Sequence, residues 1–80
     1  MWIKSQSNVL INLDHVESIF VRDNMIVCAG HKFLMESKNE RIIGSFETHY
    51  DAELVCRLIW EAIKAGEKTF YLPEKLHQDA

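Results

Sequence analysis

The chain has 80 residues, of which 48% are hydrophobic and 26% charged, and its formal net charge is -3. This length predicts a single domain over residues 1–80, and the apolar content predicts a globular rather than a disordered chain. The nine lysines and arginines are scattered along the sequence, which disfavours nucleic-acid binding because phosphate contacts need several basic groups on one face.

The first two-thirds of the sequence predicts short strands separated by polar turns. Asp23-Asn24 tolerates the positive φ angles of a tight two-residue turn. The segment 12–17 predicts a short helical turn, with Asp14 and Glu17 at the spacing of a cap. Gly30-His31 fits either a turn or a bulge inside one long strand. The predicted hairpins pair residues 2–5 with 9–11, 18–22 with 25–29, and 33–36 with 41–47.

The segment 48–66 predicts one amphipathic helix. Thr48 is followed three residues later by Asp51, as at a capped start, and Gly66 stands where a left-handed C-terminal cap belongs. The apolar side chains between them sweep roughly 240° of the helix surface, whereas a helix that covers a sheet needs a stripe only modestly wider than about 100°. The surplus predicts a further partner for this helix, in the same chain or in another.

The end of the chain predicts a last strand over residues 68–72, stopped by Pro73, and a frayed tail over 74–80. The expected fold is therefore α+β, an antiparallel β-meander of about six strands followed by one C-terminal covering helix. The alternative is a bent sheet or barrel closed by the helix, similar to a shortened pleckstrin-homology domain.

Three segments, 2–6 (WIKSQ), 10–16 (LINLDHV) and 43–48 (IGSFET), resemble short uncharacterised proteins of Gram-positive bacteria and their phages. The resemblance covers most of the chain at the level of its hydrophobic and turn pattern. It implies a bacterial or phage origin and no biochemical role.

No arrangement of reactive side chains in the sequence predicts catalysis or a cofactor. Cys28 and His31 form a single C-x-x-H pair, whereas structural zinc usually takes two close pairs of ligands. His49 and Cys56 are seven residues apart, about 10 Å along a helix and too far to share one metal ion. Both cysteines are expected to be free core residues, since an activated thiol needs a cationic or helix-N-terminal setting. The acidic residues near helix and turn starts have a structural role as caps.

The favoured function is a non-enzymatic protein-interaction module that self-associates. The expected interface residues are Leu54 and Leu58 on the margin of the helix stripe, Trp2, and the pair Phe70 and Tyr71. The alternative is a small binding domain that uses its sheet face for a peptide, a small ligand or nucleic acid. The sequence carries no signal-peptide core and no apolar run of membrane-spanning length, which predicts a cytoplasmic protein.

Overall fold

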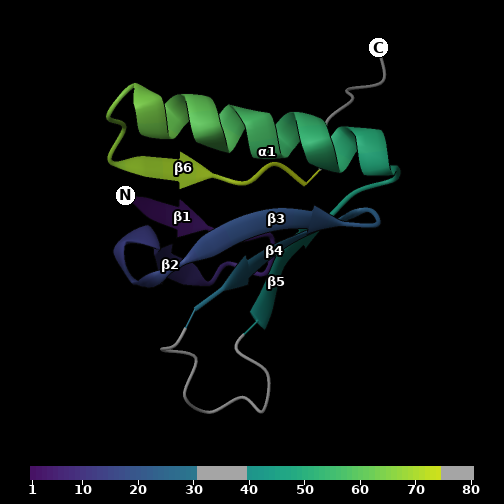
Figure 1. The fold of residues 1–80 in the computed structure, drawn as a ribbon, viewed down its shortest axis with the longest axis horizontal. Coiled ribbons are helices and arrows are strands. Elements are labelled where there is room, and N and C mark those ends of the chain that lie inside the picture. Colours follow the sequence, from purple (N-terminus) through teal and green to yellow (C-terminus); the bar gives the residue numbers. More distant parts are fainter. Residues whose placement is uncertain (31–39, 75–80) are drawn as a thin grey trace.

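The computed structural model describes residues 1–30 and 40–74, which form strands, one short 3-10 helix and one α-helix (Figure 1). In chain order these are β1 (Trp2–Lys4), β2 (Leu10–Asn12), η1 (Leu13–His15), β3 (Ser18–Arg22), β4 (Met25–Ala29), β5 (Glu40–Ser45), α1 (His49–Lys64) and β6 (Thr69–Tyr71). The predicted strand at 33–36, His31, and residues 75–80 of the predicted tail lie outside the described residues. The α+β class is confirmed.

The prediction of one six-stranded antiparallel meander is wrong. The described strands form two three-stranded sheets, one in the order β2-β1-β6 and the other in the order β3-β4-β5. Neither sheet closes into the barrel of the pleckstrin-homology-like alternative. The break falls between β2 and β3, where Asn12 Oδ1 accepts a hydrogen bond from the Asp14 N–H and η1 redirects the chain.

The first sheet contains a parallel pair, which a meander cannot contain. β1 pairs antiparallel with β2 through a short loop, but it pairs parallel with β6, with Ile3 opposite Phe70. Parallel neighbours need a long crossover connection, and here the second sheet and α1 supply it. The last strand therefore completes the sheet that the first strand began.

Local turn chemistry sets the two confirmed hairpins. Asn8, in the loop between β1 and β2, has a φ of 66°, and Asp23, in the two-residue turn between β3 and β4, has a φ of 56°. Asparagine and aspartate adopt this left-handed conformation more readily than other residues with a Cβ. The positions of these two turns could therefore be predicted from residue type.

Gln6 joins the two sheets. Its backbone N–H donates to the Ile43 carbonyl of β5 at 3.0 Å, and its side-chain Oε1 accepts from the Ser45 N–H at 2.8 Å. Its Nε2 donates to the Ser45 carbonyl at 3.1 Å and to the Pro73 carbonyl at 2.9 Å. One side chain thus ties the end of β1 to β5 and to the segment that follows β6.

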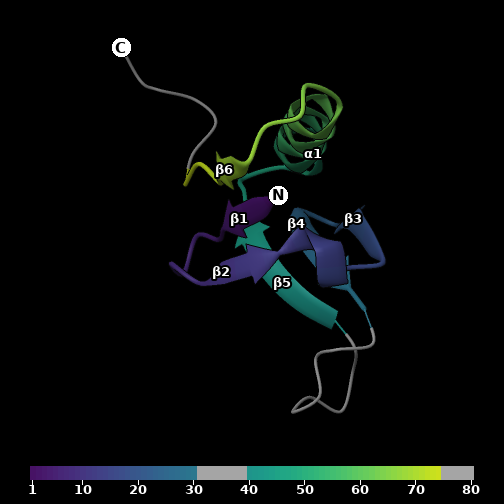
Figure 2. The ribbon, with the colours of Figure 1, turned by 90° about the vertical axis from the view of Figure 1, so that its left-hand side faces the viewer.

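Both sheets and the helix contribute to one hydrophobic core. Figure 2 shows α1 above the two sheets, between β6 of the first sheet and β3 of the second. The helix buries a narrow central stripe of Ala52, Val55 and Ile59. The other core residues come from the strands and the segments next to them: Ile3, Ile11, Ile26, Cys28, Ile43, Phe46 and Leu72.

The helix begins and ends where the sequence predicts. Thr48 Oγ1 accepts a hydrogen bond from the Asp51 N–H at 3.0 Å. At the other end Gly66 has a φ of 75°. The Glu67 N–H donates to the Ala62 carbonyl at 3.0 Å and the Gly66 N–H to the Ile63 carbonyl at 3.1 Å, which is the Schellman pattern.

We expect Gly66→Ala to lower the free energy of unfolding by about 1–2 kcal/mol, the cost of a left-handed conformation for a residue with a Cβ. A Cβ at position 66 meets no atom within 4 Å, so backbone conformation is the only source of the loss. Thr48→Ala should cost about 1 kcal/mol through the lost cap. Urea denaturation measures both, and an increase in stability of the Gly66 variant would contradict the cap.

Candidate functional site

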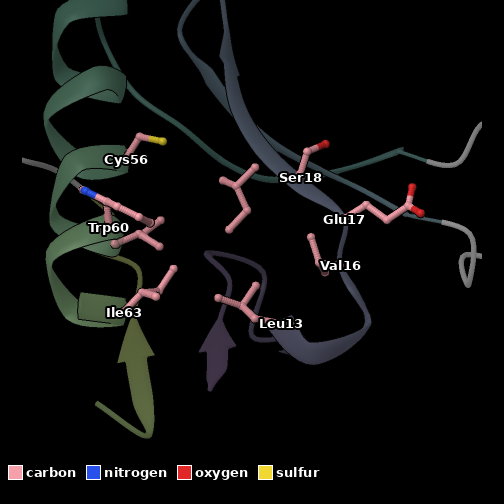
Figure 3. Close-up of a pocket in the computed structure, with 9 residues that line it drawn as sticks. Leu13, Val16, Glu17, Ser18, Cys56, Trp60 and Ile63 are labelled. Atoms are coloured by element: carbon pink, nitrogen blue, oxygen red, sulfur yellow. The ribbon is translucent and has the colours of Figure 1, made fainter. Parts of the chain in front are cut away.

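A groove runs between α1 and the chain segment that contains η1 and β3. Its helix wall carries Trp60 and Ile63, and Figure 3 shows the Ile63 side chain pointing toward Leu13. The hollow has a volume of about 330 Å³. Its lining is mostly apolar: Leu13, Val16, Glu17, Ser18, Ile19, Cys56, Ile59, Trp60 and Ile63.

The groove continues toward the N-terminus of α1. A second hollow shares Cys56 and Trp60 with the first and is bounded by Val21 of β3 and by polar residues of the helix. The two hollows therefore form one trough along the helix, which we call the α1–β3 groove. Its residues on α1 share one flank because Cys56, Trp60 and Ile63 are spaced at about one helical turn.

Trp60 and Ile63 are the most exposed apolar residues of the groove. Trp60 is 56% exposed and Ile63 42%, although both belong to the apolar stripe that the sequence assigns to the helix. Lys64 Nζ lies 5.9 Å from the centre of the Trp60 ring, so the outer side of the indole meets a cation. The indole is the largest exposed ring on this flank, and this is the kind of side chain that anchors interfaces.

Charged groups border the groove at its N-terminal end on the helix. His49 Nδ1 lies 2.6 Å from the Asp23 carbonyl oxygen, which joins the helix start to the β3–β4 turn. His49 Nε2 lies 3.3 Å from Glu53 Oε2 one turn further along. The imidazole is thus held by structural contacts on both nitrogens.

The two cysteines do not have the properties of reactive thiols. Burial raises the pKa of the Cys28 thiol to about 11, with a further contribution from nearby Cys56. Burial also raises the pKa of Cys56, and Glu53 adds to this shift. Both cysteines are free. Among residues 1–30 and 40–74, no three histidine, cysteine or acidic side chains gather in a group that could hold a metal ion.

We expect Cys28 to resist alkylation by iodoacetamide at pH 8 in the folded protein and to react fully in urea, because the thiolate is the reactive form. The raised pKa also predicts a pH effect on stability. The folded state holds the Cys28 thiol proton more tightly than the unfolded state. The contribution of this thiol to the free energy of unfolding is therefore complete below about pH 8.5 and is lost as the pH rises through about 11. Mass spectrometry of the alkylated protein checks the first expectation, and fast labelling of Cys28 at pH 8 would contradict it.

The expected interface residues occupy different parts of the surface. Leu58 is 47% exposed and Leu54 half-buried, and on a helical wheel both lie on the flank of α1 opposite Trp60. Trp2 and Tyr71 are 47% and 71% exposed. They lie on the face of the β2-β1-β6 sheet that points away from the core, since their neighbours Ile3 in β1 and Phe70 in β6 form a pair that faces the core. Phe70 points the other way and packs against the core, so it does not join this surface.

The helical periodicity of the sequence did not identify Trp60 and Ile63 as exposed residues. It did indicate an apolar stripe too wide for one sheet, and the structure has exposed apolar residues on both flanks of α1. No family model, curated protein or solved structure matches this chain. Within the described part, no helix combines the length and apolar character needed to cross a membrane.

Proposed function

We propose that the chain is a non-enzymatic protein-interaction module that self-associates. The observation that supports this most is the exposure of large apolar side chains on both flanks of α1, with Leu58 on one and Trp60 and Ile63 on the other. Large apolar side chains gathered on one element of a small domain are typical of a contact surface. A bacterial or phage origin remains a prediction that rests on the sequence resemblance alone.

An energetic comparison shows what such a contact needs. Full burial of one large apolar side chain contributes about 1.5–3 kcal/mol, and Trp60 and Ile63, which share one flank of α1, are each about half exposed. Covering both on two subunits therefore contributes roughly 3–6 kcal/mol, against an association cost of about 4–15 kcal/mol. Apolar burial on α1 alone gives a weak dimer, and a stable one needs additional contacts.

The thiols, one imidazole and the buried carboxylate of the described residues have surroundings typical of structural groups. The two thiols have raised pKa values, and the His49 ring is engaged by Asp23 and Glu53. Asp51, the buried carboxylate of the first helical turn, lies where acidic residues stabilise a helix N-terminus. These groups have structural neighbours that account for them, which favours the interaction module.

We expect the protein to sediment as a mixture of monomer and dimer whose dimer fraction increases with concentration in the micromolar range. Sedimentation velocity at several concentrations measures this directly. A monomer at every concentration would contradict self-association.

A second candidate function is a binding domain that uses the outer face of the β2-β1-β6 sheet. Trp2, Leu10 and Tyr71 are exposed there, and Lys4 Nζ lies 5.6 Å from the centre of the Tyr71 ring. This face is suited to a peptide or small ligand more than to nucleic acid, because one lysine supplies little phosphate affinity. Quenching of Trp2 fluorescence by peptides and by oligonucleotides at two salt concentrations tests it, with Trp2→Phe as the control.

A further inference from the structure

β3 presents an open edge beside the α1–β3 groove. It pairs with β4 on one side, and no described strand pairs with its other side. Opposed residues of antiparallel strands alternate between hydrogen-bonded and non-bonded pairs, and Arg22 and Met25, which flank the two-residue turn, form a bonded pair. The N–H and C=O groups of Ile19 and Val21 therefore point outward, and within the described residues nothing binds them.

The other described sheet edges are shorter or covered. β2 and β6 have three residues each, whereas β3 has five. The longest strand, β5, has the Ile43–Ser45 part of its outer edge covered by Gln6, which leaves at most the three residues 40–42 open. A regular open edge is a template for another strand, and β3 is the one described edge that combines length with exposure.

We propose that a second copy of this chain pairs its β3 with this edge, so that the two β3-β4-β5 sheets become one six-stranded sheet. The inference rests on the proposed self-association and assigns its interface. Antiparallel neighbours in a sheet are related by a two-fold axis perpendicular to the sheet. Both helices then lie on the same face, and their Trp60 flanks face each other across the axis.

The backbone geometry selects a register. The Glu17 N–H already donates to the Ala29 carbonyl at 2.8 Å, so the outward groups available for pairing are those of Ile19 and Val21. The register that uses all of them places Ile19 opposite Val21 of the second copy and Phe20 opposite its own equivalent. The Phe20 pair is then non-bonded, with its Cα atoms about 4.5 Å apart.

The surface area that a stable dimer buries is consistent with an interface that contains both β3 and α1. A specific interface buries about 800 Å² per partner, which is roughly one-seventh of the 5720 Å² that this chain exposes. A five-residue edge supplies only part of that area. The exposed faces of Trp60 and Ile63 lie on the same side as the edge and supply more, and a second copy is the occupant that brings both a matching strand and a matching helix flank.

A cross-linking experiment tests the register. Phe20→Cys should form an intermolecular disulfide under oxidised glutathione, because the expected Cα separation lies within the 4.4–6.8 Å range of disulfides. Ile42→Cys, at a position 55% exposed on β5, is the matched control and should remain a monomer on a non-reducing gel. The wild-type chain controls for the buried native thiols. Absence of the cross-link at position 20 under conditions where the protein is dimeric would overturn the strand pairing.

Two glutamate variants on opposite flanks of α1 test the interface independently. Trp60→Glu should raise the dimer dissociation constant about a hundredfold or more, since two carboxylates are buried per dimer, while Leu58→Glu should change it less than about threefold. Circular dichroism checks that both variants fold. A dimer lost in Leu58→Glu and kept in Trp60→Glu would overturn the inference and leave self-association standing, whereas a wild-type monomer at all concentrations would overturn both.

Discussion

We expect Ile3→Ala to lower the free energy of unfolding by about 2–5 kcal/mol, the usual cost of truncating a buried isoleucine. Ile3 has no exposed surface and belongs to a core to which both sheets and the helix contribute. At about 0.05–0.15 kcal/mol per residue, a chain of this length has a total stability of roughly 4–12 kcal/mol. The loss is therefore a large fraction of the total, and the variant should be partly unfolded well below the midpoint temperature of the wild type.

The matched control is Ile42→Ala, the same substitution at a site that is 55% exposed on β5. It should cost at most about 1 kcal/mol, the range of strand propensity. Urea unfolding followed by far-ultraviolet circular dichroism and by tryptophan fluorescence measures both, and the two probes should give coincident transitions because the sheets share one core. Two separate transitions would show that the two sheets unfold independently, and an equal cost for both substitutions would contradict the burial of Ile3 in the core.

The parts of the fold that depend on local sequence could be predicted. Thr48 and Gly66 carry the start and end of α1 in their own side-chain and backbone chemistry, and both positions are confirmed. The β3–β4 turn follows from Asp23 in the same way. Each of these signals acts over a few residues, so the rest of the fold is not needed to interpret it.

The pairing of β1 with β6 could not be predicted in that way. Trp2 and Thr69 pair although the second sheet and the whole of α1 separate them in sequence, and both strands have only three residues. Strand propensity indicates that a segment is extended but does not identify its neighbour. The partner is set by where the helix returns the chain, which is a property of the assembled core.

The candidate site also has one part that could be predicted from the sequence and another part that could not. The excess width of the helix stripe was evident in the sequence, but a helical wheel gives only relative angles between side chains. The structure places Ala52, Val55 and Ile59 at the centre of the buried stripe, so exposure falls on both margins. Leu58 was identified on one margin, whereas Trp60 on the other became evident only when the position of β3 was known.

We expect Gly44→Ala to lower the free energy of unfolding by about 1–3 kcal/mol, the usual cost of overpacking. Gly44 lies in β5 where the end of the first sheet crosses it, and a Cβ at this position would lie 2.5 Å from Leu72 Cδ2 and 3.1 Å from Gln6 Cδ. Its φ is not positive, so the loss comes from contact and not from backbone strain. Neither neighbour moves without cost, since Leu72 is buried and the Gln6 side chain is held by Ser45 and Pro73.

A double-mutant cycle with Leu72→Ala identifies the contact responsible. Leu72→Ala alone should cost about 2–5 kcal/mol by leaving a cavity. In the double variant, the methyl group introduced at position 44 enters the space that the leucine leaves, so the combined loss should be smaller than the sum of the two single losses by about 0.5–3 kcal/mol. Urea denaturation of the four proteins gives this coupling energy. Additive losses would mean that contact with Leu72 is not the cause of the destabilisation by Gly44→Ala.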